Sequence, residues 1–320
     1  MLTTKRWLAA TAATVGALAL TAPAAMGSVP GASTGGANGV TADAVKLHAS
    51  VNPHSRPTAY YFEYGTSRRY GSRTADSNAG SGSKSINVTA PVGGLKPNTT
   101  YHYRIVASNP DGVTSGGDRS FTTKKVPLGL TLTASPNPMI FGAGTNITGQ
   151  LTGTGNAGKQ VQLQQRAFPF TAGFANLGNA VVTDANGAFT FAALALPSTT
   201  QLRVRTTDGK VISTVATIAV AVRVKTNVSH TPVKRGRLVR FSGTIRTGRE
   251  GAQYAVQKLN RSGQWSTLAG GITRRGSTTF SGFSRRVHIR RGGSYRVFVR
   301  IVDGNYTSGI GRTIHIRTRR

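Results

Sequence analysis

The stretch LKPNTTYHYRIVAS, residues 95 to 108, decides the fold. Its second half alternates polar and apolar side chains with a period of two, which predicts a half-buried antiparallel strand. The residues expected to face inward are Tyr101, Tyr103, Ile105 and Ala107, and those expected to face outward are His102, Arg104, Val106 and Ser108. The lead-in Leu-x-Pro-x-Thr-x-Tyr places Tyr101 at a corner. Because a buried Tyr at such a corner can bond its hydroxyl to the upstream backbone, we expect a β-sandwich.

A second aromatic run, YYFEYG at residues 60 to 65, has the same alternation. Together the two stretches resemble a fibronectin type III module of the kind found in bacterial secreted proteins. The resemblance covers residues 31 to 123 and implies an all-β fold but no activity. The loop NPDGVTSGGD, residues 109 to 118, lacks Arg-Gly-Asp, so integrin-type adhesion is not implied. Other residues expected in this core are Val45, Leu47, Ala49, Val51, Tyr60, Phe62, Tyr64, Ile86, Val88 and Phe121.

The rest of the chain contains an internal duplication. Landmarks recur with nearly constant spacing, and the small length changes fall where loops are expected. The pairs are Pro138/Pro232, Gly142/Gly236 and Gly149/Gly243 at 94 positions, Phe174/Trp265, Leu177/Leu268 and Phe189/Phe280 at 91, and Asp208/Asp303 at 95. We therefore predict two copies of one all-β module, at residues 127 to 222 and 223 to 320. Both resemble the immunoglobulin-like repeats of bacterial surface proteins, and we expect Phe174 and Trp265 in their cores.

The N-terminus has the pattern of a secretory signal peptide, predicted for residues 1 to 27. Lys5 and Arg6 precede an uncharged apolar run, Leu8 to Leu20, and small residues follow it. The run is shorter than the ~20 residues that cross a bilayer. No second apolar segment follows, so we expect a secreted or cell-envelope protein without a membrane span in the mature chain. The sequence has no cysteine, which leaves the predicted three tandem antiparallel β-sandwiches to rely on packing.

Three short motifs resemble binding or catalytic sites, but each lacks a feature that the corresponding site requires. Residues 153 to 158, GTGNAG, match a dinucleotide motif but lead into a strand, not the helix N-terminus that a pyrophosphate needs. Residues 81 to 84, SGSK, lack the partner motifs of penicillin-binding enzymes. Residues 184 to 187, DANG, lack the further oxygen ligands of a calcium site. We expect loops or turns at all three, and no catalytic, cofactor-binding or metal-binding residue.

Positive charge is concentrated in the last predicted module. Residues 31 to 123 carry nine basic and five acidic side chains, residues 124 to 222 seven and two, and residues 223 to 320 twenty-two and two. Arg there alternates with β-branched residues, so outward rows of Arg are expected, and those near the C-terminus should share one face on neighbouring strands. Arg suits phosphate, sulfate and carboxylate. The candidate polyanion-binding residues are Arg286, Arg290, Arg296, Arg300 and Arg317.

Three functional hypotheses follow. The first is a non-catalytic envelope or matrix protein, acting in spacing or adhesion, whose third module holds an anionic cell-wall polymer. The second is an extracellular nucleic-acid or polyanion binder. The third is a carbohydrate-binding accessory protein that contacts polysaccharide, or a protein partner, through Phe168 and Phe170 in the loop AFPFTAGF. A solvated basic surface without a ligand is the alternative to the first two. The sequence indicates no oligomeric state.

Overall fold

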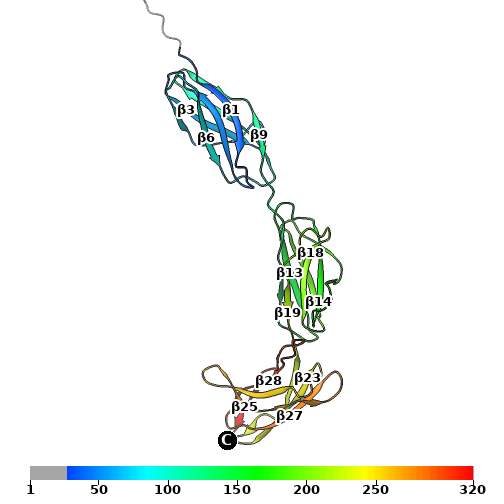
Figure 1. Cartoon of the computed structure of the whole chain (residues 1–320). Helices are drawn as coiled ribbons and strands as arrows, with labels where there is room; N and C mark the ends of the chain where they lie inside the picture. The colour runs from blue at the N-terminus through cyan, green and yellow to red at the C-terminus, as the bar shows by residue number, and fades with distance from the viewer. Residues whose placement is uncertain (1–26, 320) are drawn as a thin grey trace, which may run out of the picture. The chain divides into compact units, whose positions relative to one another are not determined.

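The computed structural model describes residues 27–319, which form an all-β protein, as the alternation predicted (Figure 1). The chain divides into two compact units between Lys124 and Lys125. The predicted signal peptide, apart from Gly27, lies outside the described residues. Within residues 27–319, no helix is long and apolar enough to cross a membrane.

The first unit contains one sandwich. Its strands are β1 (Gly31–Asn38), β2 (Val45–Asn52), β3 (Thr58–Gly65), β4 (Ser72–Arg73), β5 (Ser77–Gly80), β6 (Ile86–Val92), β7 (Thr100–Asn109), β8 (Gly112–Ser115) and β9 (Arg119–Thr122). One sheet has the order β1-β2-β6 and the other β4-β3-β7-β8, with β5 also on β3 and β9 also on β7. Every paired strand is antiparallel, which is the fibronectin type III arrangement that the sequence resembled.

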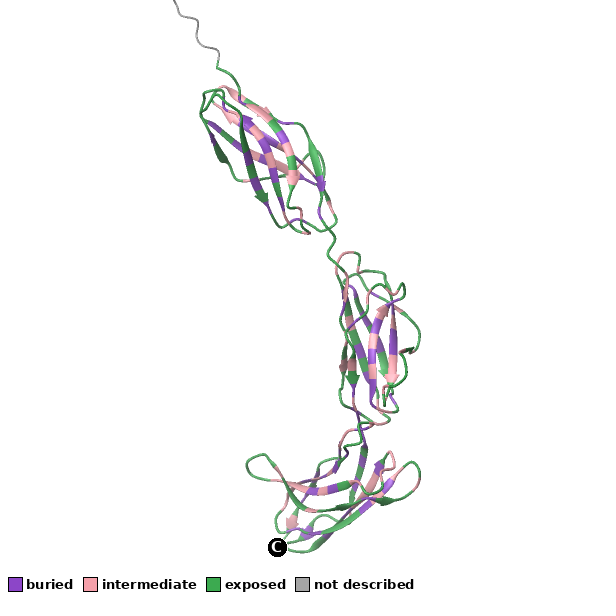
Figure 2. Ribbon diagram, viewed as in Figure 1, coloured by how far each residue is buried: buried purple, intermediate pink, exposed green. Residues whose placement is uncertain are grey.

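The predicted tyrosine corner is confirmed. Tyr101 is buried, and its hydroxyl accepts a hydrogen bond of 3.0 Å from the backbone N–H of Lys96. Its ring stacks on Phe121 with centroids 5.7 Å apart. Buried residues alternate with more exposed ones along β2, β3 and β7, and Figure 2 shows such purple bands on the strands of this sandwich. The side chains of Tyr101, Tyr103 and Ile105 on β7 therefore lie in the core, as the sequence predicted.

Two positions in this sandwich differ from prediction. Val106 was expected to face solvent but is 3% exposed. It lies on the outer face of β7, which has strands on both sides, and its cross-strand neighbour Tyr61 helps cover it. Ile86 was expected in the core but is 40% exposed, because it begins β6 at the end of the sheet.

The second sandwich is formed by residues 129–221. Its strands are β10 (Gly129–Leu130), β11 (Thr133–Ser135), β12 (Met139–Ile140), β13 (Thr145–Thr152), β14 (Gln160–Ala167), β15 (Ala175–Asn176), β16 (Val181–Val182), β17 (Ala188–Leu194), β18 (Thr200–Thr206), β19 (Ala216–Ile218) and β20 (Val220–Ala221). One sheet joins β10, β11 and β17 to β13, and the other has the order β15-β14-β18-β19, with β16 also on β14.

The third sandwich begins at Arg223. Its strands are β21 (Arg223–Val228), β22 (Val233–Lys234), β23 (Leu238–Arg246), β24 (Gln253–Leu259), β25 (Trp265–Ile272), β26 (Arg274–Arg275), β27 (Ser281–His288), β28 (Gly293–Arg300), β29 (Gly309–Ile310), β30 (Ile314–Ile316) and β31 (Thr318–Arg319). Its sheets have the orders β21-β23-β27-β26 and β25-β24-β28-β29, with β30 also on β28. The strands near the C-terminus were expected to be neighbours, and β28 and β30 do pair.

The two later sandwiches repeat the same construction details. A proline precedes each short parallel pairing, Pro138 before β12 with β20 and Pro232 before β22 with β31. Gly149 lies opposite Phe189 on the neighbouring strand, and Gly243 lies opposite Phe283 in the same way. The counterpart of Phe189 is therefore Phe283, and its predicted match with Phe280 is wrong by three residues.

Residues 303–307 of the third sandwich pack against the second. Tyr306 donates its hydroxyl proton to Pro197 O at 2.7 Å, and its ring meets Phe141 edge-on with centroids 6.0 Å apart. Backbone bonds join Thr199 N–H to Asn305 O at 2.9 Å and Thr307 N–H to Val220 O at 2.8 Å. The two sandwiches accordingly share one hydrophobic cluster and form one compact unit.

The three motif-like stretches are connections between strands, as expected. Residues 81–84 lie between β5 and β6, and residues 153–158 lie between β13 and β14. Residues 184–187 form the turn before β17, where the Asp184 carboxylate accepts the backbone N–H groups of Asn186 and Ala188 at 2.8 Å each. The Oδ1 atom of Asp184 thus stabilises the turn.

Candidate functional site: a cationic side groove

A groove runs along one side of the third sandwich, where the edge strand β25 of one sheet faces β27 of the other. From Phe283 onward, β27 pairs only with β23, so this side of the sandwich has no covering strand. The groove contains two hollows, of about 610 Å³ and 640 Å³. The chain crosses between the sheets at residues 272–274 at one end, and the loop at residues 289–292 lies at the other. We call this feature the side groove.

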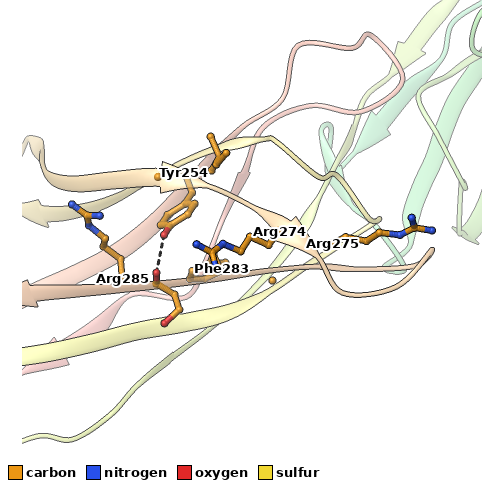
Figure 3. Close-up of a pocket in the computed structure, with 9 residues that line it drawn as sticks. Tyr254, Arg274, Arg275, Phe283 and Arg285 are labelled. Carbon is orange, nitrogen blue, oxygen red and sulfur yellow. Dashed lines mark hydrogen bonds between the residues drawn. The ribbon is translucent and has the colours of Figure 1, made fainter.

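The first hollow has an aromatic floor and a cationic rim (Figure 3). Tyr254 and Phe283 pack with ring centroids 5.1 Å apart, and the Tyr254 hydroxyl donates to Ser284 O at 3.1 Å, which joins the two sheets. Arg285 lies on one side of Tyr254 and Arg274 on the other, with its guanidinium extending toward Phe283. Arg275, the next residue, extends in the opposite direction.

Arg285 occupies a position that the strand pattern assigns to the interior. It has the same parity on β27 as Phe283 and Val287, both of which are buried, yet Arg285 is exposed. Parity points its side chain toward the opposite sheet, at the side where no strand covers the gap. An Arg between two buried apolar residues at a spacing of two is the sequence signal for this opening, and Arg285 is not among the residues predicted from the sequence.

The second hollow continues the groove along the same two strands. Leu268, Ala269, Val287 and Tyr295 contribute apolar surface. The basic residues that line it, His288 included, are Arg235, Lys258, Arg286, His288, Arg290 and Arg291. The Arg291 carbonyl accepts a hydrogen bond of 2.6 Å from the Tyr295 hydroxyl and one of 3.1 Å from Lys258 Nζ. These bonds hold the loop at this end of the groove in place.

Lys258 is held in an unusual environment for a lysine. Burial, and after it the charge of Arg291, lower the pKa of Lys258 below its ordinary value of 10.5. Its ammonium also lies 5.5 Å from the centre of the Tyr295 ring. A bound anion would offset the effect of Arg291, because an opposite charge favours the protonated form.

No carboxylate lines either hollow among the described residues. Residues 223–320 hold only two acidic side chains, Glu250 and Asp303. Asp303 forms an ion pair of 2.7 Å with Arg249, the only salt bridge within residues 223–319. Arg240 and Arg286 lie directly opposite each other on β23 and β27, an arrangement of like charges that disfavours the sheet. The positive charge around the groove is therefore not compensated within the described part of this sandwich.

In the first sandwich, several Arg side chains form ion pairs with carboxylates. Its ion pairs are Arg56–Asp111 at 3.1 Å, Arg68–Asp118 at 3.3 Å, Arg73–Asp76 at 3.4 Å and Arg104–Glu63 at 2.7 Å. Because several of its Arg side chains already have carboxylate partners, it offers less free positive charge to a ligand.

The structure separates the five candidate Arg residues. Arg286 and Arg290 line the second hollow. Arg300 is exposed on β28, in the other sheet, and Arg317 is exposed beyond the end of β30. Arg300 and Arg317 lie beyond opposite ends of the β28–β30 pairing, so they do not form one compact patch.

Arg296 has a partner already. Its Nε donates to Gln257 Oε1 at 2.8 Å, and its guanidinium lies 4.2 Å from the centre of the Trp265 ring. Burial lowers its pKa. The second sandwich repeats this arrangement: Arg203 bonds Gln164 at 2.9 Å and lies 4.1 Å from the centre of the Phe174 ring. The repetition indicates that Arg296 has a structural role.

Phe174 and Trp265 were expected in the cores, and that expectation is wrong. Both are half-buried and lie under the guanidinium groups of outward-facing Arg residues. Arg166 also covers Phe174, with 4.6 Å between its guanidinium carbon and the ring centre. The stacked Arg residues also occupy faces of these two rings that a sugar would otherwise contact.

Phe168 and Phe170 lie in the loop after β14 and are both half-buried. Their rings meet edge-on with centroids 5.6 Å apart. The Phe168 ring also lies against Gly304, where a Cβ atom would come within 2.9 Å of it. Phe168 thus contributes to the packing between the second and third sandwiches, which leaves less of it for a ligand.

No family model and no curated protein matches this chain. Among solved structures, the FN1-FN3 domains of chicken CNTN1 align over 92% of this chain and 100% of that chain, with 17% identity and a TM-score of 0.29. A segment of titin aligns over 90% and 99%, with 14% identity and a TM-score of 0.40. A tetra-tandem repeat of a large adhesion protein aligns over 90% and 74%, with 12% identity and a TM-score of 0.28. Since all three TM-scores are under 0.5, the assignment to tandem fibronectin- and immunoglobulin-like sandwiches rests on the sheets described above.

Proposed function

We propose that this chain is a non-catalytic secreted or cell-envelope protein whose third sandwich holds an anionic polymer in the side groove. The first two sandwiches then act as spacers. The observation that carries the proposal is the row of cations along the groove, from Arg274 to Arg291, without a carboxylate among the described lining residues. The signal-peptide pattern of residues 1 to 27 supports export.

The groove supports the capture of an anionic polymer better than base-specific nucleic-acid binding or carbohydrate binding. Arg donates several hydrogen bonds in one plane and so suits phosphate or sulfate groups. Sugar binding through exposed rings has less support, because Phe168 packs against Gly304 and Trp265 lies under Arg296. Nucleic acid is itself an anionic polymer, so its capture through the phosphate backbone alone is one case of the proposed function.

Salt-titrated binding of the full chain to heparin and to a fluorescent single-stranded DNA oligomer tests the proposal. With about four phosphates contacted, log K should fall with log salt at a slope of roughly −3 on the single strand. A groove variant carries Arg274→Gln, Arg285→Gln and Arg286→Gln. A matched control carries Arg246→Gln, Arg312→Gln and Arg317→Gln, three exposed residues outside both hollows.

The groove variant should reduce the steepness of the slope by about 2, since each lost contact removes about 0.7. The control variant should bind nearly as the parent does, although it loses the same formal charge. Equal binding by the two variants would mean that only overall charge matters. Absence of binding to both probes would remove the polyanion role and leave the spacer role alone.

A further inference from the structure

We propose that the side groove selects a single narrow phosphate chain without bases, lying along the strand direction, over duplex nucleic acid. This inference rests on the proposed function and adds the shape and chemistry of the ligand. The two hollows lie in sequence between the same two strands and share a cationic lining, so a chain can pass from one to the other.

The width of the groove favours one chain. The backbones of packed sheets are about 10 Å apart, and side chains such as Tyr254, which bonds Ser284 O, fill part of that space, so only a narrow ligand can lie between the two edges. The length of the groove along β27 from Gly282 to His288 is roughly 20 Å at about 3.3 Å per residue. A duplex, whose major groove alone is about 12 Å wide, is too broad to enter and would contact only the rim.

The direction of the cations favours a ligand inside the gap. Arg285 has the parity that faces the opposite sheet, and Arg274 extends toward the floor residue Phe283. Lys258 reaches the groove from the other sheet, on β24. A narrow chain would thus meet cations from both sheets, whereas a broad ligand on one outer face would meet those of one sheet only.

The floor of the groove favours a chain without bases. Tyr254 is 6% exposed and Tyr295 is 1% exposed, and both hydroxyls already donate to backbone carbonyls. Neither ring offers a free face on which a base could stack, and such stacking is a main source of affinity in single-strand binding proteins. The groove therefore recognises phosphates and gains little from bases.

Linear inorganic polyphosphate of graded length is the probe that tests this inference on the full chain. Its affinity should rise with length until the chain spans roughly 20 Å and then level off. At equal phosphate concentration, polyphosphate should compete for the chain at least tenfold better than duplex DNA, with single-stranded DNA between them.

Two pairs of variants locate the ligand. Arg285→Gln should weaken polyphosphate binding roughly tenfold, whereas Arg312→Gln, at an exposed position that lines neither hollow, should change it less than about twofold. Arg274→Gln, whose side chain extends toward Phe283 in Figure 3, should weaken binding as Arg285→Gln does, whereas Arg246→Gln, at an exposed position that lines neither hollow, should leave it nearly unchanged. Circular dichroism confirms that each variant is folded.

The competition and variant experiments can refute the groove as the site without refuting polyanion binding by the chain. If duplex DNA competes as well as polyphosphate, or if both members of each pair weaken binding equally, the chain binds polyanions on its surface and the groove is not the site. If neither heparin, DNA nor polyphosphate binds, the proposed function itself is wrong.

Discussion

Replacing Tyr101 with Phe should destabilise the first sandwich by about 1 to 2 kcal/mol, because it removes the hydroxyl that accepts the Lys96 N–H. The ring itself would stay in place, since Phe keeps the stacking on Phe121 and the buried surface. The loss is therefore confined to one hydrogen bond and to the donor left without a partner.

The magnitude follows from the surroundings of that donor. A buried unsatisfied N–H costs about 1 to 3 kcal/mol, but Lys96 is exposed, so water can replace part of the lost bond. For a domain of this size, each kcal/mol lowers the melting temperature by about 4 to 8 °C. The expected shift is thus roughly 4 to 16 °C, well above the error of a thermal scan.

Urea denaturation of residues 27–124, followed by circular dichroism, measures the effect. The urea concentration at the unfolding midpoint should fall. The slope of the unfolding free energy against urea concentration should stay unchanged, because the same surface is exposed on unfolding. Tyr61→Phe is the control, since Tyr61 lies on the same sheet and its ring, which Arg73 covers at 4.8 Å from the ring centre, is kept by Phe. An unchanged midpoint in Tyr101→Phe would refute the idea that the corner bond stabilises this fold.

Three further predictions concern the rest of the chain. Polyanion binding should weaken as pH rises through the lowered pKa of Lys258, and a pH titration of binding should lose this step in Lys258→Gln. Gly243→Ala should destabilise the third sandwich by about 1 to 3 kcal/mol in thermal denaturation, because its Cβ would overlap a backbone carbonyl, whereas Gly282→Ala has only ordinary contacts and should be tolerated. Burial alone would raise the pKa of Asp118, but hydrogen bonds from His102 and Tyr70 lower it below 3.8. The first sandwich should therefore lose stability as pH falls through that lowered value, and Asp118→Asn should lose less in an acid titration.

Much of the fold could be predicted because alternation and the corner are local in sequence. Tyr101, Tyr103 and Ile105 are buried as their parity predicted. The duplication was also visible, but the match of Phe189 depended on a loop of altered length, which shifted it from Phe283 to Phe280. Only the strand pairing with Gly149 and Gly243 fixes that register.

The candidate site was harder to predict because it depends on which strands are missing from an edge. Parity predicts that Arg286 is exposed, which it is, but it cannot say that Arg286 lines a hollow or that Arg285 faces an uncovered gap. Likewise, the position of Trp265 outside the core depends on Arg296, which arrives from another strand. Such environments follow from tertiary pairing, and no local pattern encodes them.

The docking of residues 303–307 onto the second sandwich bears on how this chain can evolve. The two later sandwiches repeat the same construction, but they are not independent of each other. Removing the third here would strip partners from Pro197 O, Thr199 N–H and Phe141, and expose part of a shared apolar cluster. The smallest piece that can be transplanted into another protein with its packing intact is consequently the pair, beginning at Lys125.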